Sequence, residues 1–463
     1  MTDSRQSEAI GRIPGVPTLL PGDDGYDEAR KVWNAMIDER PVAIVQCRNT
    51  EDVAVAVRSA AAAGVPVSVR GGGHNIAGSA VRDRALMVDL SGMRKVSVDP
   101  GKRVARVEGG AILADLDRAC QTHGLAVPAG VVSDTGVGGL TLGGGFGWLA
   151  RLHGLSVDNL LAVEGVLADG SHFRASADDA PDLFWALRGG GGNFGVATAS
   201  EFRLHPVGPE ILFGPTVFAL EDAGEVMRAW ADFMQRAPRA CTVWADFATA
   251  PTAPFLADEV HGEKALILMQ SWAGDPGEGE AILSPLTNHP AALGGFVARR
   301  PYVEAQSFLD QTYAWGARNY WGATNYASIS DDLIREVVDV TATLPTSESD
   351  ILFIAHGGAI DDVPVDATAY PHRNVRFMSS QGARWRDPSD DTRMVEWVKH
   401  CSARFARHCL DGAYVNFISE REGRENDAYA TNRQRLAEIK TRYDPSNLFR
   451  VNQNVAPAGT AAD

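Results

Sequence analysis

Apolar stretches of strand length and amphipathic stretches of helix length alternate along the start of the chain. Val42–Val45 and Val67–Val69 predict two short buried strands. Between them, Thr50 followed by two acidic residues is typical of a helix N-cap, and Gly64 is typical of a helix end. The pattern therefore predicts a strand–helix–strand unit, with residues 1–40 as a lead-in to it.

The chain up to residue 204 continues mainly with strands. Leu86–Leu90, Val104–Val107 and Ala162–Ala168 predict strands, and the alternation over residues 196–204 predicts another. Ile112–Cys120 predicts a single helix among them.

In the second half of the chain, predicted helices and strands follow one another at greater length. Asp222–Gln235 and Asp331–Leu344 predict helices, whereas Ala265–Gln270 and Ile351–His356 predict strands. This mixture is typical of an α+β domain. Residues 426–443 predict a last helix near the end of the chain.

Composition and charge exclude several classes of protein. The 463 residues include 43 Lys and Arg against 59 Asp and Glu, a net charge of −16. An acidic surface repels phosphate backbones, which argues against a nucleic-acid partner. No apolar run reaches the ~18 residues of a membrane span, and Met1–Gly15 contains no apolar signal segment, so we expect a cytoplasmic protein with no membrane partner.

Cysteine chemistry is not indicated either. The five cysteines are scattered and none forms a CxxC pair, so we predict neither a disulfide framework nor a metal site. They are Cys47, Cys120, Cys241, Cys401 and Cys409.

Glycine is the residue in excess, and 25 of the 47 glycines lie between Arg70 and Ser200. Such clusters indicate close approach of the backbone to a ligand. Residues 145–150 and 190–195 match the spacing of the dinucleotide fingerprint, but neither follows a strand and opens a helix, which argues against a Rossmann domain. The run Arg70–Asn75 follows a predicted strand, so its bare N–H groups could bind a diphosphate, with His74 close by.

Four motifs in order give a resemblance to a known family. They are Arg70–Asn75; Gly130–Gly147 with Gly154–Asn159; Asp182–Val196; and Tyr414–Phe417 through Tyr443–Asn454. From about Pro41 to Val455 the chain strongly resembles the FAD-linked oxidases of the vanillyl-alcohol-oxidase class, in the berberine-bridge-enzyme-like branch.

This resemblance implies an α+β fold with an FAD-binding domain and a substrate domain. The FAD-binding domain would comprise two subdomains over residues 41–210, and the returning residues 413–463 would complete it. The substrate domain would span residues 211–412 and carry a large antiparallel sheet, flanked by helices, over the flavin ring.

The resemblance also implies which residues contact FAD. The histidine that matches His74 is bonded to the 8α-methyl of the flavin in relatives. Gly71–Gly73 and Asn75 would hold the pyrophosphate, and Gly195 and Val196 would lie near the adenine. The full set of implied FAD contacts is Arg70, Gly71, Gly72, Gly73, His74, Asn75, Gly78, Ser79, Val132, Asp134, Thr135, Gly138, Gly139, Leu142, Gly143, Gly144, Gly145, Gly147, Trp148, Leu155, Asp158, Asn159, Gly195, Val196, Asn452 and Asn454.

Two positions near the expected flavin bear on its attachment and on the use of O₂. Val132 stands where many relatives carry a second, cysteinyl link to the flavin, so we expect attachment through His74 alone, as in monocovalent bacterial members. Thr135 matches a position that controls oxygen access in relatives, and its small side chain favours an oxidase that uses O₂.

The catalytic base is a second departure from the family pattern. Many relatives carry a tyrosine base where this chain has Phe417, and phenylalanine cannot accept a proton. Either Tyr414 or another residue takes the role, or the substrate is an amine that needs no strong base. With Tyr414 and Asn416, we expect Tyr320 to line the pocket, and His372 is a candidate base near neutral pH, although it could equally anchor domain packing.

The resemblance thus favours an FAD-dependent oxidase that transfers hydride from a C–H bond of an alcohol, amine or other small secondary metabolite to flavin N5. Two alternatives stay open. One is a dehydrogenase on the same scaffold that uses another electron acceptor. The other is a flavoprotein with a structural FAD that serves as a cyclase or binding module.

Overall fold

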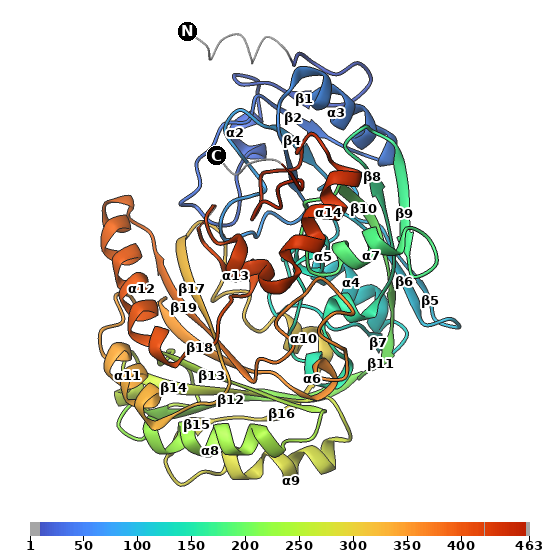
Figure 1. The fold of residues 1–463 in the computed structure, drawn as a ribbon. Helices are drawn as coiled ribbons and strands as arrows, with labels where there is room; N and C mark the ends of the chain where they lie inside the picture. Colours follow the sequence, from blue (N-terminus) through green and yellow to red (C-terminus); the bar gives the residue numbers. More distant parts are fainter. Residues whose placement is uncertain (1–9, 421, 460–463) are drawn as a thin grey trace.

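The structure, a computed structural model, describes residues 10–420 and 422–459. Part of the predicted lead-in, and most of the segment in which no secretory signal was expected, lies outside these residues. Sheets from the first 206 residues and a larger sheet from residues after 209 form two facing halves (Figure 1).

Two sheets organise the first half of the chain. The four-stranded sheet has the order β1 (Thr18–Leu19), β2 (Ala43–Gln46), β4 (Leu86–Asp89) and β3 (Val67–Arg70), in which β2 and β3 both run parallel to β4. The five-stranded antiparallel sheet has the order β5 (Val96–Asp99), β6 (Val104–Glu108), β10 (Val196–Arg203), β8 (Leu160–Val166) and β9 (His172–Ser176). A small pair, β7 (Leu125–Ala126) with β11 (His205–Pro206), lies at the end of this half.

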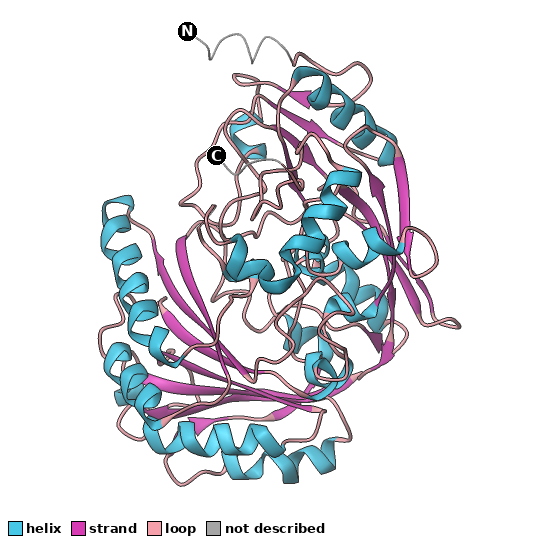
Figure 2. Ribbon diagram, in the orientation of Figure 1, coloured by secondary structure: helices cyan, strands magenta, loops and turns pink. Residues whose placement is uncertain are grey.

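The second half is built on one eight-stranded antiparallel sheet. Its order is β15 (Ala292–Gly295), β12 (Glu210–Ala219), β14 (Lys264–Trp272), β13 (Cys241–Thr249), β18 (Asp350–Ala355), β19 (Phe377–Trp385) and β17 (Arg318–Tyr326), and β16 (Ala298–Pro301) pairs with β12. The helices α8 (Ala223–Arg236), α9 (Pro276–Thr287), α11 (Asp331–Thr341) and α12 (Asp391–Phe405) lie along its outer face (Figure 2). Its inner face is therefore turned toward the first half of the chain.

The remaining helices are short and most lie in the first half or in the tail. They are α2 (Tyr26–Ala29), α3 (Thr50–Ala63), α4 (Leu113–Gln121), α5 (Val137–Leu142), α6 (Ala150–His153), α7 (Pro181–Leu187), α10 (Tyr302–Gln306), α13 (Glu425–Tyr429) and α14 (Arg433–Tyr443). None of the described helices is long and apolar enough to cross a membrane. All five cysteines are free thiols, as predicted.

Local signals placed most of the predicted elements correctly. Helix α3 ends at Gly64 in the left-handed conformation, with φ 67°, but its N-cap is Asn49 rather than Thr50, because the Asn49 side chain accepts the hydrogen bond from Asp52 N. Residues 190–195 lead into the strand β10 and not into a helix, which agrees with the argument against a Rossmann domain.

The predicted helix over residues 426–443 is broken into α13 and α14. The break is at Ala430, which has a φ of 44°. Just before it, the buried Tyr429 hydroxyl donates to Gln453 O at 2.7 Å, so tertiary contacts set the break. The tail is fixed further by the buried Lys440, which pairs with Asp444 at 2.7 Å and donates to Asn193 O at 2.6 Å.

Candidate functional site

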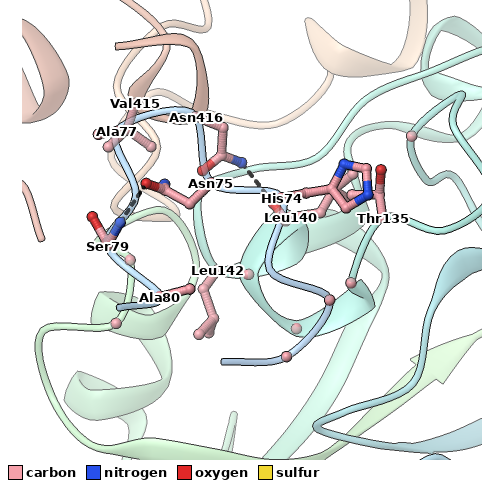
Figure 3. A pocket seen from close by; sticks show the side chains of 18 of the residues that line it. His74, Asn75, Ala77, Ser79, Ala80, Thr135, Leu140, Leu142, Val415 and Asn416 are labelled. Carbon is pink, nitrogen blue, oxygen red and sulfur yellow. Dashed lines mark hydrogen bonds between the residues drawn. The ribbon is translucent and has the colours of Figure 1, made fainter. Parts of the chain in front are cut away.

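A cavity of about 320 Å³ lies where the two halves meet. One wall consists of glycine-rich loops that follow β3 and precede α5 (Figure 3). A second wall is the inner face of the large sheet, and the tail closes the space with residues 414–418 and 449–453. The cavity is thus assembled from stretches that lie far apart in the sequence.

His74 lies in the cavity wall and is held on three sides. Its ring stacks on Trp33 with centroids 5.4 Å apart and meets the edge of Trp315 at 5.8 Å. Its Nε2 lies 2.9 Å from Asp134 Oδ1, and Trp315 Nε1 donates to Asp134 Oδ2 at 2.7 Å. Burial raises the pKa of Asp134, but the hydrogen bond and charge of His74 outweigh it and hold that pKa below the usual value. The histidine is therefore fixed in orientation beside an ionised carboxylate.

Two glycine loops meet beside His74 at a distance that only glycine permits. A Cβ on Gly72 would lie 2.3 Å from Gly136 N, and a Cβ on Gly136 would lie 2.3 Å from Gly72 N. Gly73 adopts a φ of 74°, in the left-handed region that favours glycine. Within the described part of the chain, the N–H groups of Gly72, Gly73 and His74 have no backbone acceptor. The loops therefore offer a concave row of donors suited to an anionic group such as a diphosphate.

The charges around the cavity are few. Among its described lining residues there is no lysine or arginine, and Asp350 is the lining carboxylate. The sheet side is largely aromatic and apolar, with Trp244, Trp321 and Leu352, and Phe146 from the loop after α5 adds another ring to the wall. An anion in this cavity would consequently be held by backbone N–H groups, and the sheet side suits an apolar ligand.

The comparisons with known proteins agree with this geometry. Residues 41–176 match the family model described as an FAD binding domain, and residues 413–456 match the one described as berberine and berberine like. An uncharacterised FAD-linked oxidoreductase of Bacillus subtilis (strain 168) is 31% identical over 98% of this chain and 99% of its own length. The chain belongs to the FAD-linked oxidoreductases.

Two solved structures of oxidases have the same fold as this FAD-linked oxidoreductase. The 6-hydroxy-D-nicotine oxidase of Arthrobacter nicotinovorans is 25% identical, with a TM-score of 0.84 and coverage of 95% of this chain and 98% of that one. The glucooligosaccharide oxidase of Acremonium strictum, described with a 6-S-cysteinyl, 8α-N1-histidyl FAD, is also 25% identical, with a TM-score of 0.83 over 100% of both chains. The expected family and fold class are confirmed.

The structure brings about half of the predicted site residues together around the cavity. The predicted residues that line it are Gly71, Gly72, Gly73, His74, Asn75, Ser79, Val132, Thr135, Gly138, Gly139, Leu142, Gly195, Val196, Asn452, Tyr414 and Asn416. Asn75 shapes the first loop, because its Oδ1 accepts from Ser79 N at 3.0 Å (Figure 3).

The other predicted residues do not line this cavity. They are Arg70, Gly78, Asp134, Gly143, Gly144, Gly145, Gly147, Trp148, Leu155, Asp158, Asn159, Asn454, Tyr320 and His372. Several of them have a packing reason instead. The Asn416 amide packs where a Cβ of Gly143 would lie, and Ser156 Oγ does the same at Gly145. The Arg70 guanidinium pairs with the buried Asp89 at 3.0 Å.

Asp158 and Asn159 lie in a polar cluster away from the cavity. Arg373 donates to both oxygens of Asp158, at 2.6 and 2.7 Å, and both side chains are almost fully buried. Asn159 donates to His153 O and Leu155 O at 2.9 Å each. These residues join the two halves of the chain, in agreement with the packing role considered for the segment around His372.

Tyr320 is not a cavity residue, contrary to the prediction. Alternation along β17 turns its neighbour Trp321 into the cavity, while the Tyr320 hydroxyl donates to Glu420 at 2.8 Å. The buried His372 packs edge-on against Tyr370, with ring centroids 5.5 Å apart. Burial lowers the pKa of His372 to about 4, so its imidazole is neutral near pH 7 but does not reach the cavity.

Of the predicted catalytic residues, Tyr414 and Asn416 do face the cavity. The Tyr414 hydroxyl accepts from Gly145 N at 3.0 Å and from Asn416 Nδ2 at 2.8 Å. Burial raises the pKa of Tyr414 to about 12 despite these donors, so the hydroxyl keeps its proton at neutral pH. Asn416 Nδ2 also lies 3.1 Å from Leu140 O (Figure 3), which couples the tail to α5.

Sequence reasoning missed the cavity residues that lie outside the motifs. Trp33 comes from the supposed lead-in, and Trp244, Tyr313 and Asp350 come from stretches with no recognisable motif. The aromatic-rich run around Tyr313 was the available signal, but without the register of the sheet it did not show which ring faces inward.

Proposed function

We propose that this FAD-linked oxidoreductase is an oxidase that carries FAD bonded to His74 alone and passes electrons from a small molecule to O₂. Bound FAD would supply the hydride acceptor of the reaction. One observation above the others supports the proposal. His74 lies in the cavity wall beside the bare N–H groups of the glycine loop, and its ring contacts Trp33, Trp315 and Asp134.

The cavity walls fit the cofactor that the family uses. Gly71–Gly73 and the first turn of α5 would hold the diphosphate, with bare N–H donors and with open space beside Gly139, where a Cβ would meet no protein atom within 4 Å. Gly195 and Val196 would lie beside the adenine, and Asn452 would close the site. Val132 in the wall offers no thiol, which supports one covalent link where the Acremonium strictum oxidase has two.

The substrate side of the cavity supports a neutral or cationic, largely apolar small molecule. Aromatic rings there, including Trp244 and Trp321, suit a planar or apolar group, and no described lysine or arginine is present to pair with an acidic substrate. The Arthrobacter nicotinovorans oxidase is named for a nicotine derivative, and the Acremonium strictum oxidase is named for an oligosaccharide. A compound similar to the nicotine derivative fits this description better than an oligosaccharide does. We place the reaction in the cytoplasm.

Two measurements test this function. Acid-precipitated protein should stay yellow, and a His74 peptide should carry the flavin mass; release of all flavin into the supernatant would refute the covalent link. A panel of amines, alcohols and sugars is then screened anaerobically for flavin bleaching, and we expect an apolar amine or alcohol to be active.

The same reduced protein distinguishes the alternatives. Reoxidation in air with release of H₂O₂ is the expected result for an oxidase. Reduced flavin that persists in air but is reoxidised by a dye would instead identify a dehydrogenase. Failure of every compound to bleach the flavin would favour a structural FAD.

A further inference from the structure

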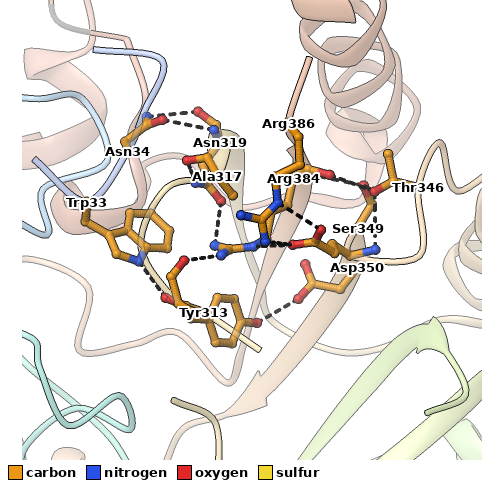
Figure 4. A network of polar contacts seen from close by, with 12 residues as sticks. Trp33, Asn34, Tyr313, Ala317, Asn319, Thr346, Ser349, Asp350, Arg384 and Arg386 are labelled. Atoms are coloured by element: carbon orange, nitrogen blue, oxygen red, sulfur yellow. Dashed lines mark hydrogen bonds and ion pairs between the residues drawn. The ribbon is translucent and has the colours of Figure 1, made fainter. Parts of the chain in front are cut away.

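Tyr313 and Asp350 form a hydrogen-bonded pair in the cavity wall, on the side of the large sheet. The Tyr313 hydroxyl donates to Asp350 Oδ2 at 2.7 Å, and both residues line the cavity and are half-buried (Figure 4). None of the predicted catalytic residues forms such a tyrosine–carboxylate pair within the cavity.

The pair lies close to the position where a base is missing. The Phe417 ring meets the edge of Trp321 at 5.4 Å, and Trp321 in turn meets the edge of Tyr313 at 6.4 Å. One tryptophan ring therefore separates Tyr313 from the place where relatives carry a tyrosine base.

The protein fixes this pair relative to His74. Trp33, which stacks on the His74 ring, donates from Nε1 to Tyr313 O at 2.6 Å. Arg384 hydrogen-bonds the neighbouring carbonyl of Ala314 and is itself held by Glu348 at 2.9 Å (Figure 4). On β19 a Cβ at Gly382 would lie 2.4 Å from Asp350 Oδ1, so a glycine leaves room for the carboxylate. A flavin on His74 and the pair are thus positioned by shared contacts.

We propose that Tyr313 and Asp350 together accept the substrate proton that Phe417 cannot accept, an inference that rests on the proposed oxidase function. The O–H or N–H bond of the substrate breaks, and its proton goes to Tyr313 Oη. The Tyr313 O–H bond breaks in the same step, and its proton goes to Asp350 Oδ2, which becomes a carboxylic acid. Bound FAD would supply the acceptor for the hydride of the substrate C–H bond, and Asp350 later returns its proton to solvent.

Tyr414 has no neighbouring carboxylate among the described residues that could accept its proton, which this proton transfer requires. Its hydroxyl accepts two hydrogen bonds, and neither partner is a carboxylate that could take its proton. The Tyr429 hydroxyl, also in the wall, donates to the carbonyl of Gln453, which is no proton acceptor at neutral pH. Among the described tyrosines that line the cavity, Tyr313 is the one whose hydroxyl donates to a carboxylate.

The charges around the pair allow Asp350 to be ionised at neutral pH. Burial raises the pKa of Asp350 to about 6, while Tyr313 and Arg384 limit the rise. Asp246 on the neighbouring strand β13 is its acidic neighbour, and burial and the charge of Asp350 raise the pKa of Asp246 well above the usual value. Burial and Asp350 raise the pKa of Tyr313, which keeps its hydroxyl protonated until the substrate binds.

The test uses the flavin-loaded enzyme and a substrate identified by anaerobic bleaching. Tyr313→Phe and Asp350→Asn should each slow flavin reduction about 10²- to 10⁴-fold with little change in substrate affinity. The wild-type rate should fall below about pH 6, and Asp350→Asn should lose this limb. Tyr443→Phe is the matched control, because the Tyr443 hydroxyl contacts Asp182 at 3.0 Å outside the cavity.

A titration without turnover tests the pair itself. The protein is labelled with ¹³C-aspartate, and the Asp350 carboxyl resonance is assigned by its loss in Asp350→Asn. This resonance should titrate near pH 6 in wild type. Tyr313→Phe should raise the pKa of Asp350, because the hydrogen bond that Tyr313 donates is lost. The proposal would be overturned if the pKa of Asp350 were the same in Tyr313→Phe as in wild type. It would also be overturned if both variants reduced the flavin within twofold of the wild-type rate and kept its pH profile. Absence of bleaching in the wild type would instead contradict the proposed function.

Discussion

Nε2 of His74 lies 2.9 Å from Oδ1 of Asp134. With Nε2 directed at the carboxylate, Nδ1 would be the ring nitrogen available for the proposed flavin bond; an N1-histidyl linkage is described for the Acremonium strictum oxidase. Trp315 holds the second oxygen of Asp134 at 2.7 Å, so the carboxylate cannot turn away from the ring. The orientation of His74 therefore depends on Asp134 and Trp315, and the proposed flavin attachment would depend on the same contacts.

Asp134→Asn should slow attachment of the flavin without preventing folding. The amide removes the negative charge that lies 2.9 Å from His74 Nε2, so the proposed attachment should become about 10- to 100-fold slower. The apoprotein is incubated with FAD, and the fraction of flavin that stays with acid-precipitated protein is followed over time. His74→Ala should retain none. Attachment at the wild-type rate in Asp134→Asn would show that the carboxylate plays no part.

Gly139→Ala should weaken FAD binding while leaving the fold intact. No protein atom lies within 4 Å of a Cβ on Gly139, although the residue lines the cavity, so the methyl group would enter ligand space. Gly72→Ala is the contrasting variant, because its Cβ would collide with Gly136 N at 2.3 Å and disturb the loops themselves. The ratio of 450 nm to 280 nm absorbance and the apoprotein Tm are measured for both.

The two variants should then differ in Tm. Gly139→Ala should keep the wild-type apoprotein Tm, and Gly72→Ala should lower it. Full flavin occupancy in Gly139→Ala would mean that the cofactor does not use this part of the cavity.

Helix ends and strands in this chain could be predicted from the sequence because the residues that determine them lie next to one another. The end of α3 follows from Gly64, and the strand after residue 195 follows from alternation in the next nine residues. The glycine loops around His74 could be predicted for the same reason, because a glycine run directly after a strand exposes backbone N–H groups that can bind an anion. The helix break at Ala430 was not, because Tyr429 is held by a residue 24 positions away.

The sheet side of the cavity depends on long-range contacts that no local signal carries. Trp33 Nε1 and Tyr313 O meet across 280 positions of sequence. Tyr320 and Trp321 are neighbours on one strand, so their side chains point to opposite faces of the sheet. The register of the strand decides which of the two rings faces the cavity. Asp350 stands at the start of a strand with no motif around it, so only the folded chain brings it to Tyr313.

Arg373→Met should destabilise the protein by about 3–5 kcal/mol, because it leaves the buried Asp158 carboxylate without its bidentate partner. Arg373→Lys should recover little, since one ammonium cannot replace the planar fork. Arg239→Met is the control: its pair with Asp362 is exposed to solvent, so its loss should change the stability very little. Urea unfolding measures all three, and equal losses for Arg373→Met and Arg239→Met would contradict the interpretation.

His372 should make the protein less stable in acid. Burial lowers the pKa of His372 from 6.5 to about 4, so between these pH values the unfolded chain binds a proton that the folded protein does not. The stability from the neutral imidazole is complete above pH 6.5 and is lost as the pH falls toward 4, by about 2–3 kcal/mol at pH 4.5.

Unfolding by urea at pH 7.5 and pH 4.5 measures this loss. His372→Gln should be less stable than wild type at pH 7.5, because packing against Tyr370 is lost, but it should lose about 2–3 kcal/mol less on acidification. The exposed His123→Gln should lose as much as wild type. His356 is buried and His153 is partly buried, and burial lowers their pKa values to about 3 and about 4, so some acid sensitivity should persist in His372→Gln. An acid-induced loss in His372→Gln equal to that of wild type would show that this imidazole is protonated in the folded protein as readily as in the unfolded chain.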